Sequence, residues 1–410
     1  MALEATAIEP GVAGEIVVAI DGAGGVDDSG VEQLELQLNR RFPKNRATIL
    51  MARPRVGEVV LASPGEVEPV PAPTSERSAL VTTEGGIPGQ YSALGALLRE
   101  GVRRRASAVA LVAAAQHDAS ADWLGLLLAP VLEGGFEYVC PTYLRRRSDA
   151  PLNTGIIYPL TRALYGQRLR QPLGGEAALS LTLAARLLDD PDWRRDPVHA
   201  GSDAWLVAKV LAGRHRVCQA WLGAWPRASH GDEGASETLV RALGLVFREM
   251  ERHTRCWQRV EGSQPVPTVG SGSWLGGEAP RVSVERLLDT FRLGARELAP
   301  VWSLVLPPAT LLALRQAGAA RADAFRLADD AWARIVYDFA VAYFVKTMER
   351  RQLLASLTPL YLGWIASFVQ ETRGLEEPAF EARVEALCAA FETQKRYLIS
   401  RWRWPDGFNP

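Results

Sequence analysis

Apolar and polar residues follow two different periodicities along this chain. Up to about residue 222, short apolar runs alternate with segments in which apolar residues recur every three or four positions. Buried strands are predicted by the apolar runs at residues 15–20, 47–52, 78–83, 107–114 and 136–144, and helices by the segments at 31–42, 91–104 and 121–133. The alternation predicts an α/β domain whose mostly parallel sheet is covered by helices on both faces. Folds of this kind bind ligands beyond the carboxyl ends of their strands.

Beyond residue 233 the apolar pattern becomes purely helical. Long amphipathic helices are expected at residues 236–257, 283–297, 308–318, 329–351, 353–371 and 378–402. We therefore expect an α/β domain over residues 1–233 and an α-helical C-terminal domain over 234–410. Residues 261–281, rich in Gly, Pro and Ser, are predicted to be an irregular connector, and the proline-rich residues 56–78 a loop or disordered insertion.

Composition narrows the functional classes. The 410 residues are 48% hydrophobic and 23% charged, and 46 basic against 47 acidic side chains give a net charge of −1. A balance this close to neutral disfavours a nucleic-acid-binding protein. The apolar runs at residues 107–115, 123–132 and 298–314 are too short or too interrupted to span a membrane. The acidic N-terminus lacks the features of a signal peptide, so we expect a cytoplasmic protein.

Few residue patterns announce a chemistry by themselves. The four cysteines, Cys140, Cys218, Cys256 and Cys388, form no CxxC pair, so neither a zinc ribbon nor a disulfide scaffold is indicated. The five histidines include no HxxH or HExxH pair, which disfavours a dedicated metal site. The glycine-rich residues 22–25 match no phosphate-binding motif and are interpreted as a turn. His117 and Asp118 follow a predicted strand, where they could contact a ligand or form an ordinary solvated loop.

Residues 153–180 are more polar than a packing element requires. The segment carries polar side chains that we expect to be exposed: Asn153, Thr154, Arg162, Tyr165, Arg168, Arg170 and Gln171. It ends in the turn Pro-Leu-Gly-Gly-Glu, in which Gly174 and Gly175 allow the backbone to approach a ligand and Glu176 would present a carboxylate.

Glu176 and Asp203 each have two interpretations. Asp203 lies at the predicted start of a helix, where it could line a pocket or cap the helix. Glu176 could face the same pocket, or it could form a framework ion pair with Arg168 or Arg170. A shared pocket would bring two carboxylates together, and their repulsion would need a cation or a hydroxylated ligand between them.

Several sequence blocks resemble the mannosylglycerate-synthase-like glycosyltransferases, a branch of the nucleotide-sugar transferases with the GT-A fold. They are YPLTRALYG (158–166), RQPLGGE (170–176), GSDAW (201–205), VCQAWLGA (217–224), GSQPVPT (262–268), RIVYDFAVAYF (334–344) and LTPLYLG (357–363). The likeness runs from about residue 15 to residue 402. It implies a Rossmann-like half that binds the nucleotide sugar, a helical half that shapes the acceptor side and the oligomer, and Mg or Mn as the cofactor.

The chain departs from the family at four donor-side positions. The metal-binding Asp-x-Asp motif corresponds to Ala113, Ala114 and Ala115, and alanine cannot ligate a metal. The Asp-rich turn after the second strand is replaced by residues 52–55, and the Pro-Gly-Lys-Gly-like turn by residues 88–91, which lack the lysine. The metal-binding histidine falls on Arg227 unless a three-residue shift brings in His230. We therefore expect no metal cofactor.

The resemblance and the departures leave three classes of function. The first is an active transferase that moves a sugar from a nucleotide donor to a small polar acceptor, with arginines such as Arg53, Arg55 and Arg227 replacing the metal. The second is an inactive GT-A protein that partners or regulates an intact paralogue, and the third is a carbohydrate- or phosphometabolite-binding module. The candidate site is the same in each: Glu176 and Asp203 as catalytic residues, with substrate contacts from Arg170, Gln171, Gly174, Gly175 and Tyr165.

Overall fold

Two compact units make up the chain in the computed structural model. The structure describes residues 14–21, 28–52, 68–69, 78–83, 90–113, 122–145, 151–196, 199–224, 235–273 and 283–405. We call the first unit the sheet unit; it comprises residues 1–143, 174–229 and 266–272. The second is the helical unit, which comprises residues 144–173, 230–265 and 273–410. Each unit contains segments from before and after residue 233. A domain boundary at residue 233 stays a prediction.

The described part of the sheet unit is built on nine strands. Their order is β3-β4-β2-β1-β5-β7-β6-β8-β9. The strands are β1 (Glu15–Asp21), β2 (Arg46–Ala52), β3 (Glu68–Pro69), β4 (Ser78–Thr83), β5 (Ala108–Ala113), β6 (Tyr138–Leu144), β7 (Ala177–Ser180), β8 (Val217–Ala224) and β9 (Thr268–Val269). β4, β2, β1 and β5 run parallel to one another, and β7 joins β5 antiparallel. The predicted α/β class with a mostly parallel sheet is therefore confirmed.

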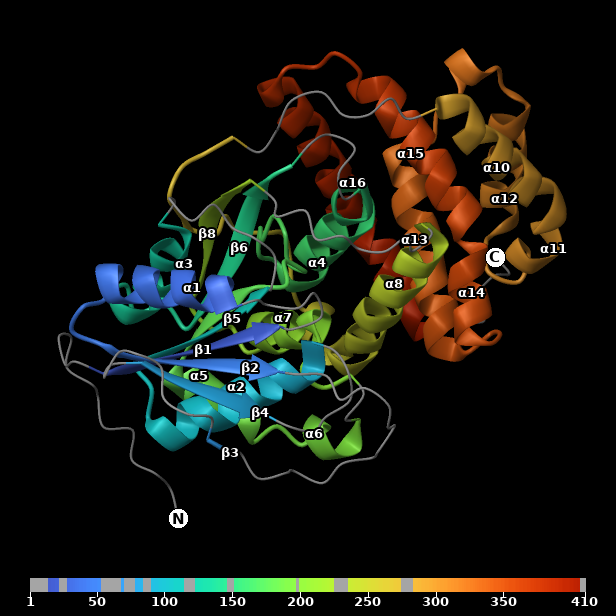
Figure 1. Cartoon of the computed structure of the whole chain (residues 1–410). Coiled ribbons are helices and arrows are strands. Elements are labelled where there is room, and N and C mark those ends of the chain that lie inside the picture. Colours follow the sequence, from blue (N-terminus) through green and yellow to red (C-terminus); the bar gives the residue numbers. More distant parts are fainter. Residues whose placement is uncertain are drawn as a thin grey trace. The chain divides into compact units, whose positions relative to one another are not determined.

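Helices cover both faces of this sheet, as Figure 1 shows. α1 (Asp28–Arg41) and α3 (Trp123–Leu132) pack against one face. α2 (Gln90–Arg104) and α5 (Leu181–Leu188) contact the strands from the other. Along β1, Ile16, Val18 and Ile20 belong to the core under α1 and α3, and the alternate residues are buried too. Because both sides of β1 are covered, its sequence is a continuous apolar run instead of an alternating one.

The sequence pattern does not reveal the shortest strands. β3 lies within the predicted loop at residues 56–78, and β9 lies within the predicted connector at 261–281. β3 pairs with β4 and β9 with β8, so each exists because a longer strand supplies its hydrogen-bonding partner. A two-residue segment shows no periodicity of its own, which is why the sequence alone could not predict it.

The described residues after β9 are helical, and a helical C-terminal region is confirmed. The helical unit contains η1 (Asn153–Ile157), α4 (Tyr158–Tyr165), α8 (Ala235–Arg252), α9 (Thr254–Trp257), α10 (Val284–Glu297), α11 (Ala299–Trp302), α12 (Pro308–Ala319), η2 (Ala322–Ala324), α13 (Asp329–Val345), α14 (Arg350–Ser356), α15 (Thr358–Thr372) and α16 (Glu377–Arg403). The predicted helix at 329–351 is broken, because Lys346 adopts a left-handed φ of 58° and ends α13. Helix pairs α10 and α15, α13 and α16, and α4 and α16 pack together.

Tryptophans anchor the core of the helical unit. Trp257, Trp302, Trp332 and Trp364 are all almost fully buried, and the rings of Trp332 and Trp364 stack with centroids 5.8 Å apart. One described segment, Arg350–Thr372, is long and apolar enough by those two criteria to cross a membrane. However, 61% of its most apolar window is buried inside the structure, as expected of a core helix.

Candidate functional site

Glu176 lies at the ligand-binding edge of the sheet. β7 runs antiparallel to β5, and Ala177 pairs with Leu111. The residue just before β7 therefore lies beside the last residues of β5, which ends at Ala113. Since β5 is parallel to β1, this is the edge formed by the carboxyl ends of the parallel strands, where α/β folds bind their ligands. The pairing of β7, which the sequence pattern did not show, thus places Glu176 at this edge of the sheet.

The Glu176 carboxylate is buried and held by a tyrosine. Its exposed fraction is 3%, and Oε2 accepts a short hydrogen bond from the Tyr143 hydroxyl group on β6. The preceding Gly175 has a left-handed φ of 78°, which an L-residue with a side chain rarely adopts. A Cβ atom at Gly175 would meet no described atom within 4 Å. The backbone conformation, and not a lack of space, therefore favours glycine at position 175. The sequence did not indicate Tyr143 as a partner of Glu176, because the two residues are 33 positions apart in the chain.

Asp203 is the first residue of α7 (Asp203–Ala212), but it is not the N-cap. Ser202 has that role, because its Oγ accepts a hydrogen bond from the backbone N–H of Trp205 at 3.2 Å. The interpretation of Asp203 as an N-cap is therefore wrong. Its negative charge acts on two residues of β6: burial first, and the Asp203 charge in addition, raise the pKa values of Cys140 and Tyr138. A carboxylate in the first turn also interacts favourably with the helix dipole.

The side chains of Glu176 and Asp203 have their neighbours on opposite faces of β6. Successive residues of a strand point to opposite faces. Tyr143, the partner of Glu176, belongs to the core under α1 and α3, as does Val139. Tyr138 and Cys140, on which Asp203 acts, have the other parity. Both carboxylates therefore belong to the sheet unit, but the residues that each one affects lie on opposite faces of β6. The catalytic roles of Glu176 and Asp203 stay predictions.

The other predicted contacts are divided between the two units. Arg170, Gln171 and Tyr165 lie there, whereas Gly174 and Gly175 belong to the sheet unit with Glu176. Arg170 Nη2 forms an ion pair of 2.9 Å with Glu381 Oε1. The expectation that Arg162, Tyr165 and Gln171 are exposed is wrong, because all three are buried. The substrate-binding roles of Arg170, Gln171, Gly174, Gly175 and Tyr165 stay predictions.

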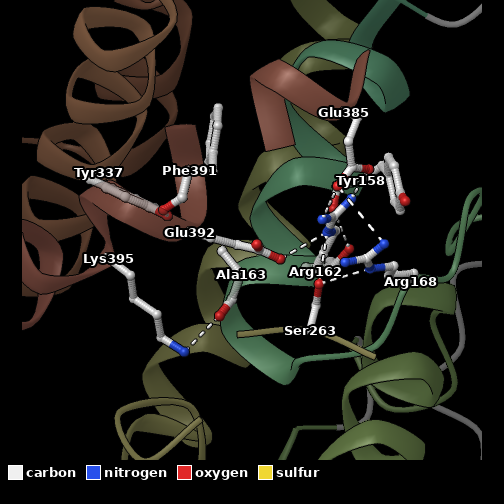
Figure 2. A network of polar contacts seen from close by, with 11 residues as sticks. Tyr158, Arg162, Ala163, Arg168, Ser263, Tyr337, Glu385, Phe391, Glu392 and Lys395 are labelled. Atoms are coloured by element: carbon white, nitrogen blue, oxygen red, sulfur yellow. Dashed lines mark hydrogen bonds and ion pairs between the residues drawn. The ribbon is translucent and has the colours of Figure 1, made fainter. Parts of the chain in front are cut away.

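Arg162 is the centre of a polar network that the sequence did not predict. It lies on α4 with an exposed fraction of 1%. Figure 2 shows its guanidinium group between two carboxylates of α16. Nη1 and Nη2 donate to the two oxygens of Glu385, each at 2.6 Å, and Nε donates to Glu392 Oε1 at 2.8 Å and to Ser263 Oγ at 3.0 Å. Arg168 joins the network through Ser263, also at 3.0 Å.

The arginine and glutamate side chains of this network stabilise each other's charged forms. Burial acts to lower the pKa of Arg162, but the hydrogen bonds to Glu385 and Glu392 outweigh it and raise the pKa. The same hydrogen bond from Arg162 lowers the pKa of Glu385. A signal for this network was present in the sequence, since Glu381, Glu385 and Glu392 are spaced by four and seven residues and so share one face of α16. Arg162, Arg168 and Arg170 therefore form ion pairs with α16 inside the helical unit.

A metal site is not formed by the described residues. Within the described ranges, no group of three or more His, Cys, Asp or Glu side chains is arranged to hold a metal ion. Ala113 is the last residue of β5, and its side chain offers no ligand atom. Most of the other positions considered for the donor side lie outside the described residues: residues 22–25, Arg53, Arg55, Ala114, Ala115, His117, Asp118, Arg227 and His230.

Solved structures similar to this chain include two glycosyltransferases. No family model matches the sequence, and no match is found among curated proteins. Glucosyl-3-phosphoglycerate synthase from Mycobacterium tuberculosis, in complex with Mn2+, UDP-glucose and phosphoglyceric acid, is 17% identical over 59% of this chain and 80% of its own, with a TM-score of 0.35. The mannosyltransferase PcManGT from Pyrobaculum calidifontis, in complex with GDP-mannose and Mn2+, is 14% identical over 97% of this chain and 89% of its own, with a TM-score of 0.38. Identities this low concern the fold alone.

These structures correct one expectation. We expected no metal cofactor, because Ala113, Ala114 and Ala115 replace the Asp-x-Asp motif. That expectation is contradicted, since both the synthase and PcManGT hold Mn2+ together with a nucleotide sugar.

Proposed function

We propose that this chain is a glycosyltransferase similar to mannosylglycerate synthase, which transfers a sugar from a nucleotide-sugar donor to a small polar acceptor. One observation carries the proposal: Glu176, a buried carboxylate, lies at the carboxyl edge of the parallel strands. A carboxylate is costly to bury unless hydrogen bonds compensate it, and here the Tyr143 hydroxyl group supplies one. The RQPLGGE block (170–176), which resembles this family, ends at the same residue.

The proposed reaction uses Glu176 as a base. The bond between the anomeric carbon and the diphosphate oxygen breaks, and its electron pair leaves with the nucleoside diphosphate. The acceptor hydroxyl oxygen forms the new bond to the anomeric carbon, and its proton passes to a Glu176 carboxylate oxygen. Tyr143 orients that carboxylate, and Gly174 and Gly175 let the backbone approach the substrate. Asp203 takes no part in this proton transfer and provides a negative charge at the start of α7. When bound, a divalent cation would neutralise the departing diphosphate.

Turnover of defined donors tests the proposal. Purified protein is incubated with UDP-glucose or GDP-mannose and with phosphoglycerate or glycerate as acceptor, each with and without Mn2+, and release of the nucleoside diphosphate is measured. We expect turnover, and we expect Glu176→Gln to lower kcat at least about a hundredfold with an unchanged melting temperature. Glu137→Gln, another carboxylate of the sheet unit, should retain full activity. Equal activity of Glu176→Gln and the wild type would refute the role of Glu176.

A catalytically inactive GT-A protein is the second candidate. Ala113 favours it, because the end of β5 lacks a carboxylate where the resembling family has one. Such a protein would partner or regulate an intact paralogue. It predicts binding of a nucleoside diphosphate or a paralogue without turnover of any donor, under conditions in which an intact glycosyltransferase is active. Turnover that depends on Glu176 excludes this candidate.

A further inference from the structure

One end of the helical unit exposes aromatic and basic side chains together. We call it the basic aromatic end and define it by Arg255, Arg259, Phe344, Val345, Lys346, Arg351, Arg403 and Trp404, all of which are exposed. Trp404 is 73% exposed, Phe344 38% and Val345 42%, although all three are large apolar side chains. Large apolar side chains exposed together mark an interaction site more often than single ones do.

Contacts between α9, α13 and α16 hold these residues at one place. The Phe344 ring, at the end of α13, stacks on Trp402 of α16 with ring centroids 4.3 Å apart, and Trp402 also packs edge-on against Trp257 of α9. The Arg403 guanidinium group donates to Gln258 Oε1 at 3.1 Å, which fixes the end of α16 beside the residues that follow α9. The exposed aromatic residues therefore project from a packed base.

Basic residues outnumber acidic ones at this end. Arg350 Nη2 bonds Glu251 Oε1 at 2.5 Å, and the same carboxylate also interacts with Arg248, Lys346 and Arg252. Glu249 forms an ion pair with Arg252 at 2.8 Å, so two carboxylates of α8 face four cations. Glu349 adds a third negative charge, and its oxygens accept hydrogen bonds from the backbone N–H groups of Arg351 and Gln352 at the start of α14. The chain as a whole has a net charge of −1, so this excess of positive charge is local.

The chemistry of this surface selects its partner. Trp and Phe side chains favour the boundary between lipid headgroups and acyl chains, and Lys and Arg beside them are attracted to anionic headgroups. Leu293, Leu304 and Leu312 are also exposed on the helical unit, but they are aliphatic, whereas the basic aromatic end carries the aromatic side chains of Phe344 and Trp404. We propose that the basic aromatic end docks the protein peripherally on a membrane surface that contains anionic lipid.

Vesicle co-sedimentation of the full chain tests this inference. The vesicles are phosphatidylcholine alone, or phosphatidylcholine mixed with phosphatidylglycerol, each at low and at high salt. We expect binding to the mixed vesicles only, and weaker binding at high salt because salt screens the attraction. Removing one basic residue near the surface should weaken binding about fivefold, so Lys346→Glu combined with Arg403→Glu should nearly abolish it.

Matched variants separate the two contributions. Trp404→Ser should lower binding severalfold without changing the salt dependence. Leu312→Ser and Arg321→Glu change an exposed apolar and an exposed basic residue elsewhere in the helical unit and should bind as the wild type does. All of these residues are exposed, so unchanged melting temperatures will show that the variants are folded.

Three results would overturn the inference. The first is a wild type that does not sediment with the mixed vesicles, and the second is equal binding by Lys346→Glu/Arg403→Glu and the wild type. The third is a different partner for the same surface: dimerisation lost in Trp404→Ser, or binding to duplex DNA lost in the charge variant, in either case without vesicle binding. None of these readouts depends on transferase activity, so the inference can fail while the proposed function stands.

Discussion

Arg162 shows how a polar residue becomes part of a core. Its position in a segment full of arginine and glutamine predicted exposure, yet its guanidinium group is enclosed by Glu385, Glu392 and Ser263. Glu385 is more than 200 residues away in sequence and is itself half exposed. Only tertiary structure brings the two together, because nothing local to residues 158–166 indicates that an acidic stripe will cover them.

Removing this arginine should destabilise the helical unit. We expect Arg162→Ala to lower the free energy of unfolding by about 3 kcal/mol, because it breaks the ion pairs of a buried guanidinium group with Glu385 and Glu392. Arg168→Ala removes a partly exposed arginine of the same network and should cost less than about 1 kcal/mol. Urea unfolding followed by circular dichroism measures both. Equal costs would show that the buried position of Arg162 confers no special stability.

Asp338 should make stability depend on pH. Burial raises its pKa to about 6, although Tyr397 and Arg401 hydrogen-bond Oδ1 and oppose the shift. The folded protein therefore holds this proton more tightly than the unfolded chain does. The contribution of Asp338 is complete below pH about 4 and is lost as pH rises through about 6, an effect on the order of 3 kcal/mol.

The Asp338→Asn variant should lack this pH dependence. Urea unfolding of both proteins between pH about 4 and about 7 gives the difference, because every other titrating group cancels. We expect the wild type to lose stability relative to the variant as pH rises. Asp289→Asn, which changes an exposed carboxylate of the same unit, should follow the wild type. Parallel curves for wild type and Asp338→Asn would contradict the raised pKa.

At the scale of elements, the end of α4 depends on one glycine. Gly166 follows the helix with a left-handed φ of 71°, and its N–H donates to the carbonyl of Arg162. A Cβ atom there would lie 2.8 Å from Val260 Cγ1 and 3.0 Å from the carbonyl oxygen of Gly262. The sequence indicates a helix end at this glycine, but the close approach of residues 260–262 is a tertiary feature.

Gly166→Ala should therefore cost more than the same change at Gly374. Gly374 has a φ of 74°, and a Cβ there would meet no described atom within 4 Å. We expect about 1 kcal/mol for Gly374→Ala from the backbone alone and at least about 1 kcal/mol more for Gly166→Ala from the added contacts. Thermal unfolding measures both. If the two variants melt together, the space around Gly166 is less restricted than its neighbours indicate.

The π-helical turn η1 depends on a second glycine. A Cβ at Gly155 would lie 2.2 Å from the Trp364 ring, and the Gly155 carbonyl accepts a hydrogen bond from Trp332 Nε1 at 2.8 Å. We expect Gly155→Ala to destabilise the protein by about 3 kcal/mol, because the packed rings cannot move away. Gly244→Ala, inside α8 with only one ordinary contact, should instead stabilise by up to about 1 kcal/mol. Equilibrium unfolding should show shifts of opposite sign.

At the scale of the whole molecule, donor binding should raise stability. A ligand that binds only the folded state at a hundred times its dissociation constant adds about 2.7 kcal/mol to the free energy of unfolding. We expect UDP-glucose or GDP-mannose, with or without Mn2+, to raise the melting temperature. Glucose 1-phosphate is the control, since it carries the sugar and one phosphate without the nucleoside. A melting temperature that no nucleotide sugar changes would leave the donor side of the proposal without support.

The sequence by itself determined the fold class, the helical C-terminal region and the strands β1, β2, β4, β5 and β6, but not β8 (Val217–Ala224). An apolar run such as residues 15–20 or a helical stripe such as 329–345 encodes its element in neighbouring residues, because burial of one strand or one helix face sets a local period. Tertiary structure alone decided the site. The pairing of β7 with β5 puts Glu176 at the sheet edge, and Tyr143 holds it there. Such pairings join residues far apart in the chain, and no local period records them.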